Sequence, residues 1–216
     1  MNVEIKNLES TIAQSESIQL KLAPKVQYYD DPAFKGEYVT GIDVSYSDDK
    51  AYACAIVTHI PTSTVTRKER IVIDCEFPYI PSHFYLREGP AVTKLLEKLD
   101  STGPILIDGN GILHPRRMGL ASYIGVTLDK QTIGVAKSLL LGSIGERVNN
   151  IASIHEDGEE IGAALWIEKK MNPIYVSIGH RISLKTAIEV VSISTLHGYP
   201  EPLRRAHLCS NCARGQ

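Results

Sequence analysis

Three consecutive runs of strand-like sequence constrain the fold of this chain more than any other feature. They cover residues 37–46, 51–60 and 64–74, and only short polar breaks separate them. Alternation of apolar and polar residues is typical of half-buried strands, and short breaks between such runs are typical of hairpins. The sequence therefore predicts an antiparallel meander of three strands.

Helices and strands alternate after this meander. The apolar runs at 105–107 and 133–136 fit parallel strands that are covered on both faces. The other predicted elements are a helix over 5–22 that ends at Pro24, helices around 92–99, over 115–126 and around 187–195, and a strand pair over 162–167 and 174–178.

Together these elements predict an α/β fold with a ribonuclease H-like mixed sheet. Three antiparallel strands come first, parallel βαβ units follow, helices cover both faces, and residues 1–216 form a single domain. Ligands of such sheets bind at the carboxyl ends of the parallel strands. Asp108 and Lys137 stand at these ends, and Asp43 can lie beside Asp108 if the first strand neighbours the parallel one.

Three acidic residues occupy positions that are costly for an unpaired charge. Asp43 interrupts an apolar run, Asp108 closes another, and Glu88 precedes Gly89 and Pro90 at an expected helix start. Burial of an unpaired polar group costs roughly 2–7 kcal/mol, so the acids suggest a bound hard cation such as Mg²⁺ or Mn²⁺. The alternatives are a helix N-terminal acid for Glu88 and a turn residue for Asp108.

The charge distribution is uneven along the chain. Residues 1–108 carry 11 Lys and Arg against 16 Asp and Glu, whereas residues 109–216 carry 12 against 9. An acidic metal centre beside a basic half suits a nuclease, although chance segregation of surface charge explains the numbers equally well. No apolar stretch reaches the roughly 20 residues that span a bilayer, and no signal peptide is visible, so we expect a cytoplasmic protein without a membrane partner.

The four cysteines give no metal-binding pattern. We expect Cys54 and Cys75 to be small core residues. Cys209 and Cys212 form a lone CxxC, which lacks the second ligand pair of a structural zinc site unless His197 or His207 helps. Free thiols or a terminal disulfide between Cys209 and Cys212 are the preferred interpretation.

A series of short motifs extends over nearly the whole chain. In order they are GIDVSY from Gly41, PYIP from Pro78, REGP from Arg87, DGNG from Asp108, HPRR from His114, GLAS from Gly119, IGVAK from Ile133, SIGHRIS from Ser177 and PEP from Pro200. This combination resembles the endonuclease V family, metal-dependent nucleases that nick nucleic acid near inosine, the product of adenine deamination. Ser82 and Phe84 depart from the family pattern, in which glycine and a smaller aliphatic residue are usual, and they put base selectivity in question.

The resemblance implies a role for each of the acids. Asp43, Glu88 and Asp108 would hold Mg²⁺ around the scissile phosphate, with Mn²⁺ as an expected substitute. Lys137 would stabilise charge on the phosphate, and His207 would bind metal or assist proton transfer. The alternative for Lys137 and His207 is an ordinary surface charge.

The resemblance also implies residues that recognise the base and the backbone. Tyr79 would be a wedge that fills the gap left by an extruded base, held rigid by its prolines. The wedge loop is Pro78, Tyr79, Ile80 and Pro81, and the base pocket is Gly109, Gly111, His114, Gly119 and Leu120. Candidate phosphate contacts, each of which is equally well a solvated charge, are Arg116, Arg117, His180, Arg181, Lys185, Arg204 and Arg205.

The expected activity is therefore that of a Mg²⁺-dependent endonuclease. It would hydrolyse the second phosphodiester bond 3′ to inosine, leave 3′-hydroxyl and 5′-phosphate ends, and serve the repair of deaminated bases. The sequence does not separate DNA containing deoxyinosine from RNA containing inosine, and we expect a monomer. Two alternatives stay open: a nuclease of branched or flap structures on the same fold, and a non-catalytic binder, against which the complete set of three acids argues.

Overall fold

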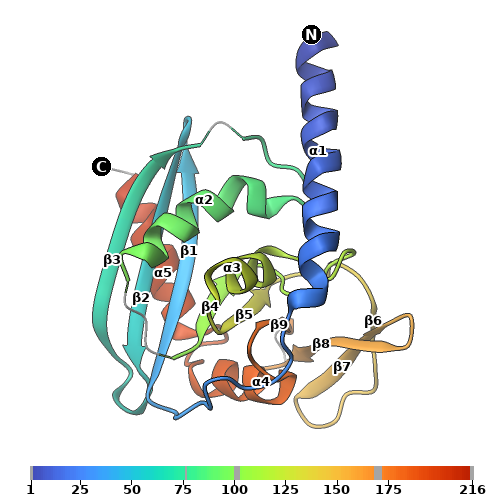
Figure 1. Ribbon diagram of the computed structural model, residues 1–216. Coiled ribbons are helices and arrows are strands. Elements are labelled where there is room, and N and C mark those ends of the chain that lie inside the picture. Colours follow the sequence, from blue (N-terminus) through green and yellow to red (C-terminus); the bar gives the residue numbers. More distant parts are fainter. Residues whose placement is uncertain (1, 76, 100–102, 168–171, 215–216) are drawn as a thin grey trace.

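A nine-stranded sheet forms the centre of the computed structural model, which describes residues 2–75, 77–99, 103–167 and 172–214 (Figure 1). The strand order is β3-β2-β1-β4-β5-β9-β8-β7-β6. The first three strands are β1 (Tyr38–Ser47), β2 (Lys50–His59) and β3 (Thr64–Asp74), and they pair antiparallel in sequence order. The predicted meander is confirmed, with bounds that differ by at most one residue.

Parallel pairing is confined to the middle of the sheet. Strand β4 (Ile105–Asp108) lies parallel to β1 on one side and to β5 (Thr132–Ala136) on the other. The next strand, β9 (Ile174–His180), is antiparallel to β5, so the expected series of parallel units stops after one. The α/β class and the mixed sheet are confirmed.

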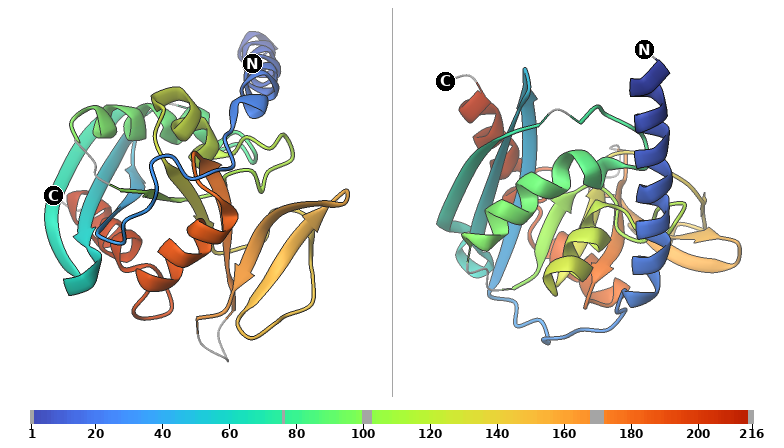
Figure 2. Two further views of the ribbon diagram at one scale, coloured as in Figure 1. Left: turned by 60° about the horizontal axis from the view of Figure 1, so that its bottom comes forward. Right: turned by 45° about the horizontal axis from the view of Figure 1, so that its top comes forward.

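The far edge of the sheet contains more strands than the sequence predicted. Strands β6 (Ser143–Ile144) and β7 (Ile151–Glu156) were missed, and β8 (Glu159–Leu165) begins before the expected residue 162. Figure 2 shows that these strands form an arm that projects from the body of the protein. Strand β7 shows no clear alternation in its sequence, because its buried positions are Ala152 and Ile154 while the apolar Ile151 is only partly buried.

Two pairs of helices cover the two faces of the sheet. Helices α2 (Phe84–Glu97) and α3 (Leu120–Leu128) lie on one face, and α4 (Leu184–Ile193) and α5 (Glu201–Arg214) lie on the other (Figure 1). In β4 the side chains of Ile105 and Ile107 pack toward α2 and α3, whereas Leu106 packs into the opposite core. This alternation explains why the strand is apolar throughout.

The N-terminal helix α1 (Asn2–Leu22) confirms the predicted first helix and continues into the short helix η1 (Ala23–Lys25). A second short helix, η2 (Ile60–Thr62), joins β2 to β3. The lower half of α1 lies beside α3 and the loop that precedes α2, and its N-terminal end extends beyond the body (Figure 1). None of the described helices is long and apolar enough to cross a membrane.

Two helix starts differ from the prediction. Glu88 lies inside α2 and not at its beginning, because Pro90 is accommodated within the helix. Pro115 does not begin a helix, since α3 starts at Leu120. Residues 109–119 form a loop, in which Gly119 N–H donates to Gly111 O at 2.9 Å. A left-handed φ of +52° at Arg117 is incompatible with a continuous helix from Pro115.

Helix α5 was not predicted, and it corrects the interpretation of the cysteines. Cys209 lies on its buried face and forms a disulfide with Cys54 of β2, 155 residues away in sequence. Cys54 is a core residue as predicted, but the interpretation of Cys209 as a free thiol or as the partner of Cys212 was wrong. Cys75 is a partly buried free thiol and Cys212 an exposed one.

Candidate active site

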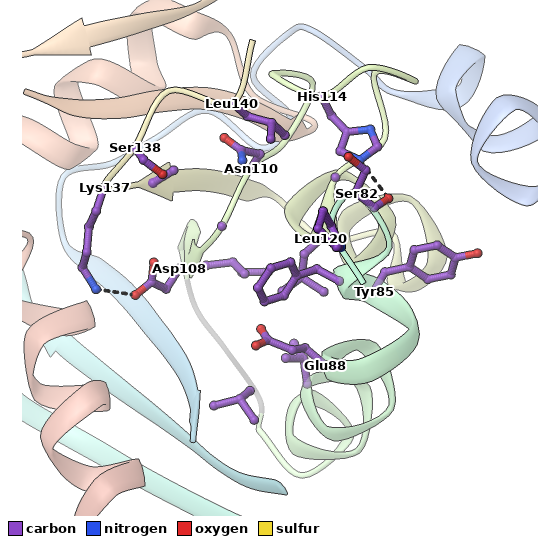
Figure 3. A pocket seen from close by; sticks show the side chains of 18 of the residues that line it. Ser82, Tyr85, Glu88, Asp108, Asn110, His114, Leu120, Lys137, Ser138 and Leu140 are labelled. Carbon is purple, nitrogen blue, oxygen red and sulfur yellow. Dashed lines mark hydrogen bonds and ion pairs between the residues drawn. The ribbon is translucent and has the colours of Figure 1, made fainter. Parts of the chain in front are cut away.

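A cavity of about 420 Å³ lies beside the carboxyl ends of β4 and β5, between these strands and α2 (Figure 3). The register pairs Ile42 with Ile107, and Asp43 and Asp108 each follow directly in their strands. Glu88 extends from helix α2 into the same cavity (Figure 3). The acids that sequence reasoning singled out therefore share one cavity.

Asp43 is held by two side chains of α5. The Ser210 hydroxyl donates to Oδ2 of Asp43 at 2.6 Å, and His207 Nδ1 lies 3.4 Å from Oδ1. Burial raises the pKa of the Asp43 carboxyl and the charge of Asp108 raises it further, whereas Ser210 and His207 act in the opposite direction. Ser210 was not predicted, since nothing in the sequence places residue 210 beside residue 43.

His207 has a defined hydrogen-bond arrangement although its side chain is half exposed. The Asn211 side-chain amide donates to His207 Nε2 at 3.1 Å. In the neutral imidazole the proton is then on Nδ1, which faces the Asp43 carboxylate. The structure thus brings the predicted fourth active-site group to the acidic cluster.

Glu88 is the most perturbed of the three acids. Its side chain is buried in the middle of α2, and burial, followed by the charges of Asp43 and Asp108, raises its pKa to about 8. Tyr46 lies nearby, and its own pKa is raised by burial and by the Glu88 charge. The carboxylates thus oppose one another's ionisation, as expected of like charges in one cavity.

Asp108 is paired with the predicted lysine. Lys137 Nζ lies 2.8 Å from Asp108 Oδ2, and the two side chains point toward each other (Figure 3). The same Nζ lies 4.8 Å from the centre of the Tyr199 ring. Burial and the Asp108 charge raise the pKa of the Tyr199 hydroxyl, a neighbour that the sequence did not reveal. One cation of the chain therefore already compensates part of the acidic charge.

The acidic cluster fits a divalent cation by donor type. Three carboxylates line one cavity, and their mutual repulsion is relieved when a cation binds between them. Within the part of the chain that the structure describes, no three His, Cys, Asp or Glu side chains are arranged closely enough to hold a metal ion as they stand.

The loop before α2 supplies the other wall of the cavity. Tyr79 is 59% exposed and packs edge-on against Phe84, with ring centres 4.9 Å apart. Of the residues predicted to recognise a base or act as a wedge, those that line the cavity are Tyr79, Pro81, Gly109, His114, Gly119 and Leu120. Pro78 and Ile80 lie in the same loop without lining the cavity, and Ser82, Phe84, Asn110 and Leu140 join the lining.

Gly111 has a structural place behind the cavity. A side chain at Gly111 would collide with the backbone of Ile178, and one at Gly119 with the carbonyl of Asn110. Glycine at 111 therefore lets the loop pack against β9, and glycine at 119 lets the loop fold back on Asn110. Burial lowers the pKa of the nearby His114 to about 4, so its imidazole is neutral at physiological pH.

The predicted phosphate contacts are not gathered at the cavity. Arg116 is largely buried in a network behind the wedge loop, and Arg117 pairs with Glu159 at 3.3 Å. His180 is the last residue of β9 and pairs with Thr132 at the end of the strands opposite to Asp108. Arg181 follows it directly, and Lys185 lies in the first turn of α4. Arg204 and Arg205 both bind Glu201 at 2.7 Å and keep part of their surface in solvent.

Known proteins match this chain along most of its length. The family model of endonuclease V covers residues 20–208. Endonuclease V of Thermofilum pendens is 38% identical over 209 residues, which are 95% of this chain and 90% of the relative. These matches leave few residues at the ends of the chain unaccounted for.

Solved structures agree with the fold. Endonuclease V of Streptomyces avermitilis has a TM-score of 0.85 at 33% identity and covers 94% of this chain and 93% of its own. Ciona intestinalis endonuclease V, in complex with a 24mer DNA containing an inosine followed by a ribo-adenosine, has a TM-score of 0.86 at 30% identity, with coverages of 95% and 98%. By sequence and by structure, the chain belongs to the endonuclease V family, whose members are nucleases that act on phosphodiester bonds.

Proposed function

We propose that this protein is a Mg²⁺-dependent endonuclease that recognises inosine and hydrolyses the second phosphodiester bond on its 3′ side. The products are 3′-hydroxyl and 5′-phosphate ends, and the reaction serves the repair of deaminated bases. The observation that carries the proposal is the single cavity shared by the three acids and the exposed Tyr79 loop. A relative in complex with inosine-containing DNA supports the choice of base.

Asp43, Glu88 and Asp108 are the residues that would hold the metal. When bound, Mg²⁺, or Mn²⁺ in its place, polarises the phosphoryl oxygens and lowers the pKa of an attacking water. The hydrogen bond from Ser210 keeps the Asp43 carboxylate in one orientation. Glu88, with a pKa near 8, is the acid whose ionisation depends most on a neighbouring cation.

Lys137 and His207 would act on the reacting phosphate. The Lys137 ammonium group is at the cavity and can stabilise negative charge that develops on phosphoryl oxygens. The His207 ring lies 3.4 Å from Asp43 and is oriented by Asn211, which places it close enough to the proposed metal site to bind metal or to exchange a proton. Both are proposals that mutation of the single side chain can test.

Tyr79 would take the place of an extruded base. Its ring is exposed and packs against Phe84. Pro78 and Pro81 enclose Tyr79 and Ile80 and limit the motion of the loop, as a wedge requires. The flipped hypoxanthine would enter the cavity lined by Gly109, His114, Gly119 and Leu120. Gly111 would shape this wall through its packing against β9.

Backbone binding would use the basic residues that keep solvent-exposed surface. Arg117, Arg204 and Arg205 fit this role, although each also has an acidic partner. Three predicted contacts lie near the end of the strands that is opposite to Asp108 and are left out of the proposed interface: His180, Arg181 and Lys185. Arg116 is also left out of the proposed interface, because its guanidinium group is bound by Gln19 and Glu16 and is largely buried.

A gel assay with a labelled duplex that carries one inosine tests the proposal directly. We expect a single nick at the second 3′ phosphodiester bond in Mg²⁺, none in EDTA, none in the adenine-containing duplex, and none with Asp43→Ala. An inosine-containing RNA of the same sequence compares the two nucleic acids. Cleavage of unmodified branched duplexes, or inosine binding without any cleavage, would overturn the proposed reaction.

A further inference from the structure

The guanidinium group of Arg116 is engaged by the protein itself. Nε donates to Gln19 Oε1 at 2.6 Å, Nη1 to Glu16 Oε1 at 3.0 Å, and Nη2 to the carbonyl oxygen of Ser82 at 3.0 Å. Nη2 also lies 3.3 Å from Nε2 of His83, and the side chain is only 17% exposed. These contacts occupy four of the five N–H groups of the guanidinium, so the fork is directed mainly into the protein.

The Ser82 carbonyl is the point where this network meets the cavity wall. It accepts from three side chains: Gln19 Nε2 at 3.2 Å, His114 Nε2 at 3.1 Å and Arg116 Nη2 at 3.0 Å. The backbone N–H of Arg116 donates to His114 Nδ1, which fixes the neutral imidazole with its proton on Nε2, toward Ser82. Ser82 has a left-handed φ of +63°, so three donors hold a peptide in a conformation that serine rarely adopts.

Helix α1 supports the network from behind. Gln19 is 1% exposed, and its amide also donates to the Met118 carbonyl at 2.8 Å. One helix turn earlier, Ser15 Oγ is 2.7 Å from His83 Nδ1 and its carbonyl accepts from the Tyr85 hydroxyl. A single helix therefore ties the start of α2 to the loop that contains His114.

We propose that Arg116 and Gln19 are positioning residues that clamp the Ser82 carbonyl and thereby fix the wedge loop, residues 78–81, which directly precedes Ser82, over the cavity. The Arg116 fork joins α1 to Ser82, and Gln19 joins α1 to both Ser82 and the segment after His114. This assignment rests on the proposed function in one respect, that the wedge loop contacts the substrate base. It replaces the phosphate contact that the motif around Arg116 predicts.

Replacement of Arg116 by lysine distinguishes the positioning role from a phosphate contact. Arg116→Lys keeps the positive charge but loses the planar fork that reaches Gln19, Glu16 and Ser82 together. Gln19→Ala removes a side chain that is 1% exposed but lines the cavity, so hydrogen exchange, which needs no substrate, separates loss of the clamp from loss of a base contact. Arg67→Lys is the matched control, because exposed Arg67 also binds a glutamate, Glu69, and a backbone carbonyl, but on the edge strand β3.

The first measurement compares the variants on inosine duplex and on undamaged duplex over a range of salt concentrations. We expect Arg116→Lys and Gln19→Ala each to lower kcat/KM on inosine by about ten- to a hundredfold, with a double variant that is little worse than either. Binding to undamaged duplex and its salt dependence should not change. A phosphate contact would give the opposite result: Gln19→Ala active, Arg116→Lys nearly active, and a salt slope that falls by about one in Arg116→Ala.

The second measurement needs no substrate. Amide hydrogen exchange over residues 79–86 should be faster in Arg116→Lys and Gln19→Ala than in the wild type and in Arg67→Lys, with the rest of the sheet unchanged. Unchanged exchange in both variants would overturn the clamp. If Arg116→Lys fails to fold, Gln19→Ala carries both measurements, and if the wild type cuts no inosine substrate, the proposed function fails while the exchange result still decides the clamp.

Discussion

Ser210 donates a 2.6 Å hydrogen bond to Asp43, and this bond joins helix α5 to strand β1 of the sheet. The Ser210 side chain is fully buried, and its hydroxyl also contacts the carbonyl of His207. The orientation of a proposed metal ligand thus depends on a helix near the end of the chain. The arrangement makes α5 part of the active site and not only a cover for the sheet.

Ser210→Ala should weaken both the fold and the reaction. Loss of the hydroxyl leaves one oxygen of a buried carboxylate without this partner, which costs about 1–3 kcal/mol of stability. Loss of the preferred Asp43 orientation should lower the single-turnover cleavage rate by about tenfold, the equivalent of one hydrogen bond. Guanidinium unfolding and single-turnover cleavage at saturating enzyme measure the two effects.

Ser194→Ala provides the control for that experiment. Ser194 is also buried, at the C-terminal cap of α4 and away from the cavity, and its hydroxyl donates to the Val190 carbonyl at 2.7 Å. It should lose stability without loss of cleavage rate at saturating enzyme. Equal cleavage rates for the two variants would show that Ser210 has no part in placing Asp43.

The first strands could be predicted from the local alternation of apolar and polar residues, because a period of two is present wherever one face of a strand packs on a core. The runs that became β1, β2 and β3 are long and regular, and so were placed within a residue. Helix α5 was missed because its buried positions, Leu203, Ala206 and Cys209, include small or sulfur-containing side chains between charged ones. These three residues are spaced three positions apart, and this spacing was the only indication of a helix that they gave.

The site was predictable in its acids and not in their supports. Asp43 and Asp108 could be placed by strand order alone, and Lys137 by the same reasoning. The contacts of Asp43 with Ser210 and of Arg116 with Gln19 each join segments about a hundred residues or more apart. No local periodicity encodes such contacts, since they depend on how helices pack on the finished sheet.

The disulfide between Cys54 and Cys209 should contribute strongly to stability. It links β2 to α5 across 155 residues, and a closed loop of such length stabilises by about 3–5 kcal/mol through the unfolded state. Cys54→Ala/Cys209→Ala, or reduction of the wild type, should lower the guanidinium midpoint. Cys212→Ser removes an exposed thiol of the same helix and should leave the midpoint unchanged. Equal midpoints for oxidised and reduced wild type would contradict the prediction.

Glu201 should make the protein sensitive to acid. Its hydrogen bonds with Arg204 and Arg205 lower the pKa of its carboxyl from 4.5 to about 2. A lowered folded-state pKa gives stability that is present above pH 4.5 and is lost as the pH falls from 4.5 to 2. We expect about 2 kcal/mol, less than the pKa difference alone implies, because both guanidinium groups reach solvent.

Unfolding of Glu201→Gln as a function of pH measures this contribution. The variant should be less stable than the wild type at pH 7 and should approach it toward pH 2. Glu159→Gln breaks an exposed ion pair with Arg117 and should change stability by less than about 1 kcal/mol. A constant difference between Glu201→Gln and the wild type from pH 7 to pH 2 would exclude the ion pairs as its cause.

The acidic cluster should bind Mg²⁺ in the absence of nucleic acid, since its carboxylates raise one another's pKa and a cation removes that repulsion. At one hundred times the dissociation constant, a ligand of the folded state stabilises by about 2.7 kcal/mol, which raises Tm by roughly 5–10 °C in a chain of this size. Glu88→Gln should abolish most of this rise and the cleavage activity. Glu97→Gln changes an exposed glutamate on the same helix, α2, and should retain both. A Mg²⁺-dependent rise in Tm of equal size in the two variants would place the metal outside this cavity.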